Sequence, residues 1–342
     1  MWALFSSRRR EGFTLVELLI VIVVIAILAA ITIVAYGGVT EKARVATLQS
    51  DLSQAKTFME SYLAENGQYP PDLATAESAG LKLSTPDSNV SYSVNNSASP
   101  ATWGLTVTNG SDSYYINNTT AATATSGAWV TNLVLDPEPF VYNLTGYAWN
   151  SGRWFGGSPA AGTYSIVTNA SDGPTASMKN YARKTWSTSP PSISSQGDSG
   201  FNIASGIKGI SVAVGDSYTI SAYLRPSSLK NAEISIYQYD SAGATVARIY
   251  GPVTVLPANK WTRISYTYTN TTSNVAYFQA LPDISGSSSN GVSVWVPGDT
   301  LDGTGYMITK GTNLYDYSDP YTNSAWTWNG TANDSTSTGP AA

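Results

Sequence analysis

The sequence predicts two units in tandem: an α+β unit with one long N-terminal helix and a small antiparallel sheet, and then an all-β jelly-roll sandwich. An uninterrupted apolar run opens the chain at residues 12–34, and apolar residues at helical spacing continue it to Leu63. Beyond residue 132 the pattern changes to short segments that alternate apolar and polar residues, separated by Gly, Pro, Asn and Ser. Such segments are typical of a sandwich.

The apolar run is long enough to cross a bilayer, although it carries one carboxylate, Glu17, near its start. Each Leu, Ile, Val or Phe favours insertion by about 0.3 to 0.6 kcal/mol, while one acidic residue at mid-helix costs about 2.5 to 3.5 kcal/mol. The segment can therefore insert with Glu17 in place. The basic residues at 8–10 place the N-terminus in the cytoplasm. A plain anchor or a signal peptide is the simpler alternative, but a signal peptide has a shorter apolar region.

Residues 12–21 read GFTLVELLIV, which resembles the signature of type IV prepilins. The resemblance implies that residues 1–12 are a leader, that a prepilin peptidase cleaves after Gly12, and that Phe13 is then N-methylated. It also implies that Glu17 meets the N-terminal amine of a neighbouring subunit in a filament, which offsets the cost of burying its charge. The expected partners are other pilin subunits, the peptidase and the inner-membrane pilus machinery. One departure from many pilins is that no proline precedes Pro70.

The first helix is expected to cover residues 13–66, with 13–35 as the transmembrane segment and filament core. Between residues 40 and 63 the apolar positions form one stripe at period 3.6, which predicts packing against a small sheet. Gly67, followed by Pro70 and Pro71, ends the helix. Residues 67–124 then predict a compact β head with strands at 90–94, 103–108 and 114–116.

Composition limits the possible functions. The chain has 342 residues, 12% of them charged, and a net charge of −5, so nucleic-acid binding is not expected. It has no histidine and no cysteine, which excludes a His-based catalytic triad, a His metal site and a disulfide. We expect that the protein requires no cofactor and has no enzymatic activity. A glycosidase with paired carboxylates is the enzymatic alternative, but no spacing of acidic residues suggests such a pair.

The small, uncharged residues 119–127 mark the boundary between the two units. Residues 125–131 are predicted to be a linker, and residues 132–342 to be the sandwich. Its expected strands are 218–224, 232–239, 261–268, 274–280, 292–296 and 306–309. The segments 132–137, 215–224, 261–265 and 306–311 resemble strands of jelly-roll carbohydrate-binding modules, which implies a lectin-like domain.

Tyrosines recur on the polar phase of the predicted sandwich strands. A tyrosine ring offers an apolar surface to a sugar, while its hydroxyl, Arg and Gln supply directed hydrogen bonds. The predicted glycan site is Tyr223, Arg225, Tyr237, Tyr239, Tyr277 and Gln279. The alternative is ordinary cross-strand aromatic pairing. A site on loops is a further alternative, built from Trp149, Trp154, Trp186, Trp326 and Trp328.

A structural calcium ion is possible, because jelly-roll modules of this kind often hold one near their first and last strands. The candidate oxygen ligands are Asp136, Asp299 and Asp302; surface turns are the simpler explanation.

These features together predict a type IV pilus subunit with an adhesive head. We expect a single-pass precursor in the cytoplasmic membrane and then an extracellular filament. A sandwich on every subunit would crowd a filament, which favours a minor or tip subunit. A major pilin and a pseudopilin of a type II secretion-like system are the alternatives.

Overall fold

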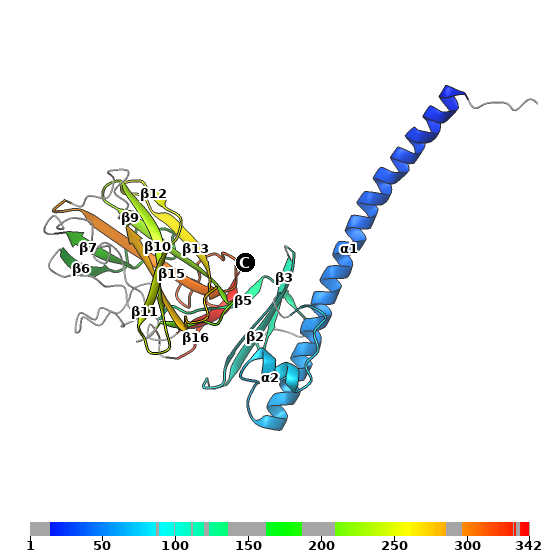
Figure 1. The fold of residues 1–342 in the computed structure, drawn as a ribbon. Helices are drawn as coiled ribbons and strands as arrows, with labels where there is room; N and C mark the ends of the chain where they lie inside the picture. Colours follow the sequence, from blue (N-terminus) through cyan, green and yellow to red (C-terminus); the bar gives the residue numbers. More distant parts are fainter. Residues whose placement is uncertain are drawn as a thin grey trace, which may run out of the picture.

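A computed structural model (Figure 1) describes residues 14–86, 89–98, 100–110, 112–119, 123–135, 162–186, 209–284, 296–330, 332 and 336–341. Gly12, Phe13 and Asp136 lie outside the described residues, as does most of the strand predicted at 292–296.

The long helix predicted from the apolar pattern is α1 (Leu15–Asn66). It begins at the N-cap Thr14 and ends at Gly67, whose φ of 72° is the left-handed conformation that glycine adopts readily. The Gly67 N–H donates to the Leu63 carbonyl at 2.8 Å. In the part of the chain that the structure describes, one stretch, Leu15–Thr32, is long and apolar enough to cross a membrane, and none of it is buried.

The C-terminal half of α1 packs on a four-stranded antiparallel sheet, here called the first sheet. Its strands, in spatial order, are β1 (Val90–Asn95), β2 (Thr102–Asn109), β3 (Asp112–Asn117) and β4 (Thr125–Ser126), and the short α2 (Leu73–Ser78) lies between α1 and β1 in the chain. The predicted apolar stripe is the buried face of α1. This core includes Leu48, Leu52, Ala55 and Met59 of the helix and Trp103, Leu105, Val107 and Ile116 of the sheet.

The segment 125–131 is not the linker that its composition predicts. Thr125 and Ser126 form β4 of the first sheet, and β5 (Ala128–Asn132) pairs with the C-terminal strand β17 (Ser337–Ala341). Gly127 joins the two with a φ of 105°, and its N–H donates to the Ser113 carbonyl. Ala128, Trp129 and Val130 are buried, so the segment belongs to the packed structure and is not a flexible connection.

The strands β5, β17 and β16 (Thr327–Trp328) form a three-stranded docking sheet that covers the first sheet on the side opposite α1 (Figure 1). Trp129 of the docking sheet lies against Gly104, where a Cβ would stand 1.8 Å from the indole Cδ1. The Thr106 hydroxyl accepts from the Trp129 N–H at 2.7 Å and donates to the Trp129 carbonyl at 3.1 Å. The two units are therefore joined by a packed interface and not by a free tether.

Two further sheets face each other as a sandwich. The β13 sheet has the order β13 (Thr262–Thr269), β9 (Ser217–Pro226), β15 (Thr300–Lys310), β7 (Tyr181–Trp186), β6 (Gly162–Val167). The β10 sheet has the order β11 (Thr245–Tyr250), β10 (Lys230–Tyr239), β14 (Tyr277–Ile284), β8 (Ile210–Ser211), with β12 (Thr254–Leu256) also pairing with β10. The apolar phases of both sheets meet in one core that includes Ile220, Ala222, Leu224, Ile234, Ile236 and Phe278.

The predicted sandwich architecture is thus confirmed in the described residues. The strand predicted at 274–280 begins three residues later, at Tyr277, because the preceding residues form a turn in which the Val275 N–H donates to the Thr272 carbonyl. The strand predicted at 306–309 is the end of β15, which starts at Thr300 and bends at Gly305, where φ is 61° and the register with β9 shifts.

Candidate ligand-binding face

The six predicted glycan-binding residues do not form one site, because they lie on two different sheets. Tyr223 and Arg225 belong to β9 in the β13 sheet, and the other four belong to β10 and β14 in the β10 sheet. Each group projects away from the shared core. The outer faces of two stacked sheets point in opposite directions, so the single site predicted from the strand phases is wrong.

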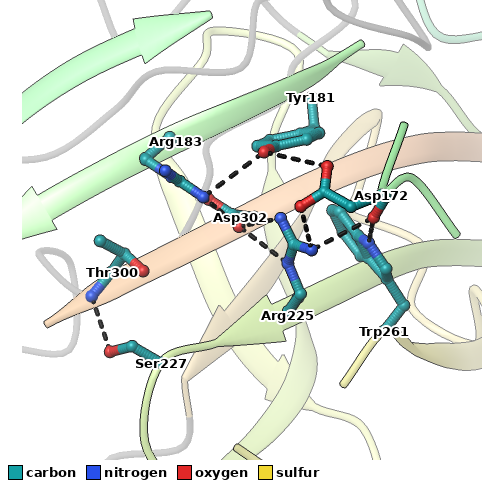
Figure 2. Close-up of polar contacts among 8 residues, drawn as sticks. All are labelled: Asp172, Tyr181, Arg183, Arg225, Ser227, Trp261, Thr300 and Asp302. Atoms are coloured by element: carbon teal, nitrogen blue, oxygen red, sulfur yellow. Dashed lines mark hydrogen bonds and ion pairs between the residues drawn. The ribbon is translucent and has the colours of Figure 1, made fainter. Parts of the chain in front are cut away.

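Arg225 is held within an ion cluster on the outer face of the β13 sheet (Figure 2). Asp302 of β15, only 2% exposed, accepts from the Arg183 Nε at 2.6 Å and from the Arg225 Nε at 2.9 Å. Asp172 accepts from the Arg225 Nη1 at 2.8 Å. This hydrogen bond lowers the pKa of the Asp172 carboxyl, against a smaller opposing effect of burial. The guanidinium of Arg225 is thus committed to two carboxylates of its own chain.

Aromatic rings enclose the same guanidinium. Its carbon lies 5.0 Å from the ring centre of Tyr181 and 4.7 Å from that of Trp261, which is cation–π distance. The Trp261 indole N–H donates to the Asp172 carbonyl at 2.6 Å. We call this outer surface of the β13 sheet the closed face.

The Tyr223 ring also packs against other residues of the chain on the closed face. It packs against a cluster that joins the segment before β7 to the segment after β15, whose members include Met178, Met307, Tyr317 and Trp326. A Cβ at Gly305 would lie 3.0 Å from the Tyr223 ring, so the ring sits tightly over the β15 bend. Two segments outside the strands pack against the polar phase of β9, where Tyr223 and Arg225 are only partly exposed.

The outer surface of the β10 sheet is different, and we call it the tyrosine face. Tyr239 lies directly opposite Tyr277, and Tyr237 directly opposite Gln279. The Tyr239 hydroxyl donates to the Gln279 side-chain oxygen at 3.1 Å, and burial raises the pKa of Tyr239. Tyr237, Tyr239 and Tyr277 are partly exposed and Gln279 is buried beneath them. Four of the six predicted residues are therefore adjacent.

Two residues of the tyrosine face are absent from the sequence prediction. Arg248 of β11 lies opposite Tyr237, and its guanidinium carbon is 4.6 Å from the Tyr237 ring centre and 4.8 Å from that of Tyr250. Its Nη2 donates to the Ser235 hydroxyl at 3.0 Å. The Tyr250 side chain is 43% exposed. The turn around Gly243 and the alternation of 245–250 are the hairpin signals that could have placed both residues beside β10.

The alternative site on tryptophan-bearing loops is not assembled by the described residues. Trp186 lies in the sandwich core and Trp326 in the cluster below the docking sheet. Trp328 packs edge-on against Tyr321 at 5.9 Å. Trp149 and Trp154 lie outside the described residues.

The carboxylates predicted to bind calcium are occupied by other groups. Asp302 is bound by Arg183 and Arg225. Asp299 accepts from the hydroxyls of Ser227 and Ser228 and lies 3.5 Å from the buried Lys230 ammonium group. A dication would have to displace these cationic partners, so neither carboxylate fits a calcium site.

Glu17 caps the first turn of α1. The Thr14 N–H and hydroxyl each donate to the Glu17 Oε2 at 2.8 Å, and the Glu17 N–H donates to the Thr14 hydroxyl at 3.2 Å. This reciprocal arrangement is a capping box. A single subunit therefore holds the carboxylate at the very start of the helix, next to the predicted new N-terminus.

Residues 7–33 match the family model described as the prokaryotic N-terminal methylation motif. With the exposed apolar helix, the capping Glu17 and the small sheet, this match makes the N-terminal part of the chain similar to type IV pilins and pseudopilins.

Known relatives come from both branches of that family. The chain is 42% identical over 87 residues to the type IV wide pilus major component PilA4 of Thermus thermophilus, which covers 25% of this chain and 65% of that protein. It is 36% identical over 65 residues to the type II secretion system core protein G of Aeromonas hydrophila, covering 19% of this chain and 46% of that protein. The chain thus spans less than two thirds of either relative, and these matches cover no more than a quarter of its own length.

Similar solved structures include carbohydrate-binding modules. One is the CBM22-1 xylan-binding domain of Paenibacillus barcinonensis Xyn10C, with 10% identity and a TM-score of 0.30, covering 55% of this chain and 97% of that one. Another is a CBM4 module, with 17% identity and a TM-score of 0.30, covering 53% of this chain and 99% of that one. The likeness is one of fold.

Proposed function

We propose that this chain is a subunit of a type IV filament that displays a glycan-binding head for attachment to surfaces or host cells. The carrying observation is the tyrosine face, where three partly exposed tyrosines surround Gln279. Their rings can stack on sugar C–H groups and their hydroxyls can bond sugar hydroxyls, while the buried Gln279 holds the Tyr239 hydroxyl in place.

Binding without cleavage is the proposed activity. A glycosidase needs two carboxylates with different protonation states across a cleft. On the closed face, Asp172 and Asp302 are both bound to Arg225 (Figure 2), and the hydrogen bond from Arg225 lowers the pKa of Asp172. This supports a binding role and gives no support to a general acid.

The binding proposal is tested with the full chain in detergent micelles on an array of bacterial, plant and host glycans. The variant Tyr237→Ala/Tyr239→Ala is expected to lose binding at least tenfold, while Tyr237→Phe/Tyr239→Phe retains the stacking part of the affinity. The matched control is Tyr321→Ala, because Tyr321 is 49% exposed but lies outside the tyrosine face. Undiminished binding by the double alanine variant would refute the proposal.

For assembly, we propose cleavage after Gly12, methylation of Phe13, and pairing of Glu17 with the amine of a neighbouring Phe13. The precursor would sit in the cytoplasmic membrane and the mature subunit in an extracellular filament. Glu17→Ala should abolish incorporation into filaments while leaving the head folded, because the neighbouring amine loses its partner. Glu65→Ala, at the far end of the same helix, is the control. Normal incorporation of Glu17→Ala would contradict the model.

We further propose that the subunit is a minor or tip component. The sandwich lies on the side of the first sheet opposite the assembly helix (Figure 1), so it adds bulk at the outside of a filament on every copy. Quantitative mass spectrometry of sheared filaments tests this: a minor component is expected at a few per cent of the dominant subunit. Dominance of this chain in the filament would favour a major pilin.

A pseudopilin role is the second candidate, favoured by the identity to core protein G. Deleting the chain and assaying secreted enzymes separates the two roles. Loss of secretion with surface attachment intact would support the pseudopilin role.

A further inference from the structure

One connecting segment crosses the whole closed face. Residues 168–180, here called the strap, join β6 to β7 at one side of the β13 sheet. Asp172 of the strap contacts Arg225 of β9 and also Trp261, which directly precedes β13 at the opposite edge of the sheet (Figure 2). The strap therefore reaches from one edge of the sheet to the other and back.

Few contacts hold the strap on the sheet. The Asp172 carboxylate accepts from the Arg225 Nη1 at 2.8 Å, and the Asp172 backbone carbonyl accepts from the same Nη1 at 3.1 Å and from the Trp261 indole N–H at 2.6 Å. Within the strap only Met178 and Asn180 are buried, and both lie near its return to β7. A segment with so little buried apolar surface opens at a low cost in free energy.

The strands beneath the strap carry an excess of positive charge. Asp302 of β15 lies opposite Arg225 of β9 and opposite Arg183 of β7. Arg263 of β13 lies opposite Tyr223, which is two residues from Arg225 and therefore on the same face. Three arginines thus share this face with the carboxylate of Asp302.

The segments that cover the face supply further negative charge. Asp172 of the strap bonds Arg225, and Asp316, in the segment after β15, lies 3.5 Å from Arg263 with its side chain 95% exposed. The backbone carbonyls of Asp172 and Tyr315 accept from the same two guanidinium groups. Oxygen atoms of the covering segments therefore occupy donors that could otherwise bind the oxygen atoms of a ligand.

We propose that the strap is a displaceable lid over a second binding site, and that the ligand of this site is an acidic glycan whose sugar rings carry carboxylates. A sugar carboxylate replaces the Asp172 carboxylate on Arg225, and a sugar hydroxyl replaces the Asp172 carbonyl at the Trp261 N–H. The partly exposed Trp261 ring favours a sugar over an acidic peptide, because a sugar ring stacks on an indole and a carboxylate side chain does not. This site is separate from the tyrosine face, so the inference goes beyond the proposed function.

The strap and the ligand compete for the same donors. The affinity of the native chain is therefore the affinity of the open form, reduced by the fraction of molecules that are open. Removing the Asp172 carboxylate weakens an exposed ion pair of the closed form and should raise the affinity for the ligand by about two- to fivefold. A residue that itself bound the ligand would change the affinity in the opposite direction.

The test uses the full chain in detergent micelles with oligogalacturonate and with its fully methyl-esterified form, which has the same sugars without free carboxylates. We expect the native chain to bind the acidic form and not the ester, although its net charge of −5 disfavours unspecific binding of polyanions. Asp172→Asn should bind about two- to fivefold more tightly. The control Glu65→Gln removes the same charge at an exposed position far along α1 and should leave the affinity unchanged. Trp261→Ala should weaken binding at least tenfold.

Hydrogen exchange tests the lid without any substitution. Addition of oligogalacturonate should speed amide exchange in residues 168–180 and slow it in β9 and β13, because the ligand takes the place of the strap. Slower exchange in the strap would mean that the ligand binds on top of it, which would overturn the lid.

The other outcomes separate this inference from the proposed function. Equal binding of acid and ester, or binding of neither, overturns the acidic-glycan inference and leaves the tyrosine face untouched. Tighter binding of polyaspartate than of oligogalacturonate would assign the site to an acidic peptide instead. If Tyr237→Ala/Tyr239→Ala abolishes binding of oligogalacturonate, the acidic glycan binds on the tyrosine face and the second site is refuted.

Discussion

The two outer faces of the sandwich start from the same strand pattern and end differently. On the closed face, the polar phase of β9 is filled by two arginines, two aspartates and the segments that flank β7 and β15. On the tyrosine face, the polar phase of β10 keeps the rings of Tyr237 and Tyr239 partly exposed, without such an ion cluster among the described residues, although Glu233 and Ser235 of the same phase are buried. Strand periodicity therefore determines on which face a residue lies. The long connecting segments determine whether that face is exposed to solvent or packed against other parts of the chain.

The largest loss of stability is expected from Asp302→Ala on the closed face. This removes a buried carboxylate between Arg183 and Arg225 and leaves both guanidinium groups without it. Loss of one partner from such a buried cluster costs about 3 to 5 kcal/mol, and thermal unfolding should report it. Asp172→Ala, at the exposed end of the same cluster, should cost less than about 1 kcal/mol. Equal costs would show that the closed face is not organised around Asp302.

The same substitution placed on each face sharpens the contrast. Tyr223→Ala removes a packed ring on the closed face and should lower the free energy of unfolding by about 1 to 3 kcal/mol, with no direct effect on ligand binding. Tyr237→Ala should cost less than about 1 kcal/mol of stability and reduce binding. Chemical denaturation and glycan binding, measured on both variants, test whether Tyr223→Ala mainly lowers stability and Tyr237→Ala mainly lowers binding. A reversed pattern would exchange the roles of the faces.

A smaller effect is expected from Tyr239→Phe. It removes the hydroxyl that bonds Gln279 at 3.1 Å and keeps the ring. Loss of one such hydrogen bond costs about 0.5 to 1.5 kcal/mol. Gln279→Leu should give a similar loss in thermal denaturation, and the double variant should cost less than the sum of the two singles. Strict additivity would mean that the bond contributes nothing to the face.

The smallest effect is expected from acid. The pKa of Asp172 lies below the ordinary 3.8 in the folded chain, mainly because Arg225 donates to its carboxylate. Its stabilising contribution is therefore complete above about pH 4 and is lost as the pH falls through the lowered folded-state pKa. Asp172→Asn should flatten the acid limb of the stability curve, while the tyrosine variants should leave that limb unchanged.

Local patterns in the sequence predicted much of the molecule. The spacing of Leu48, Leu52 and Met59 specified the buried face of α1, and alternation placed Ile220 and Leu224 in the core. Both patterns survive because each reflects a fixed geometry, 3.6 residues per helical turn or two per strand repeat. The same alternation correctly grouped four of the six predicted glycan-site residues on one face: Tyr237, Tyr239, Tyr277 and Gln279.

The remaining features depend on contacts between distant segments. No local pattern near residues 125–131 predicts that β5 pairs with residues 337–341. The contact of Trp129 with Gly104 joins two units that the sequence predicts to be separate. The covering of Tyr223 also depends on Met178 and Trp326, which belong to segments without periodicity. Asp302 was predicted to bind calcium because the sequence does not show its arginine partners. Arg183 and Arg225 lie on other strands, and only the strand register brings them next to Asp302.

The pairing of β5 with β17 also has a mechanical consequence for the adhesive filament proposed above. Tension between a surface-bound sandwich and its helix enters through Gly127 and runs along β5. Five residue pairs join β5 to β17, and antiparallel hydrogen bonds lie perpendicular to the strands. Sliding β5 lengthwise therefore loads these bonds together in shear instead of opening them one after another. The junction between the two units is built to resist pulling along the direction in which an attached cell would pull.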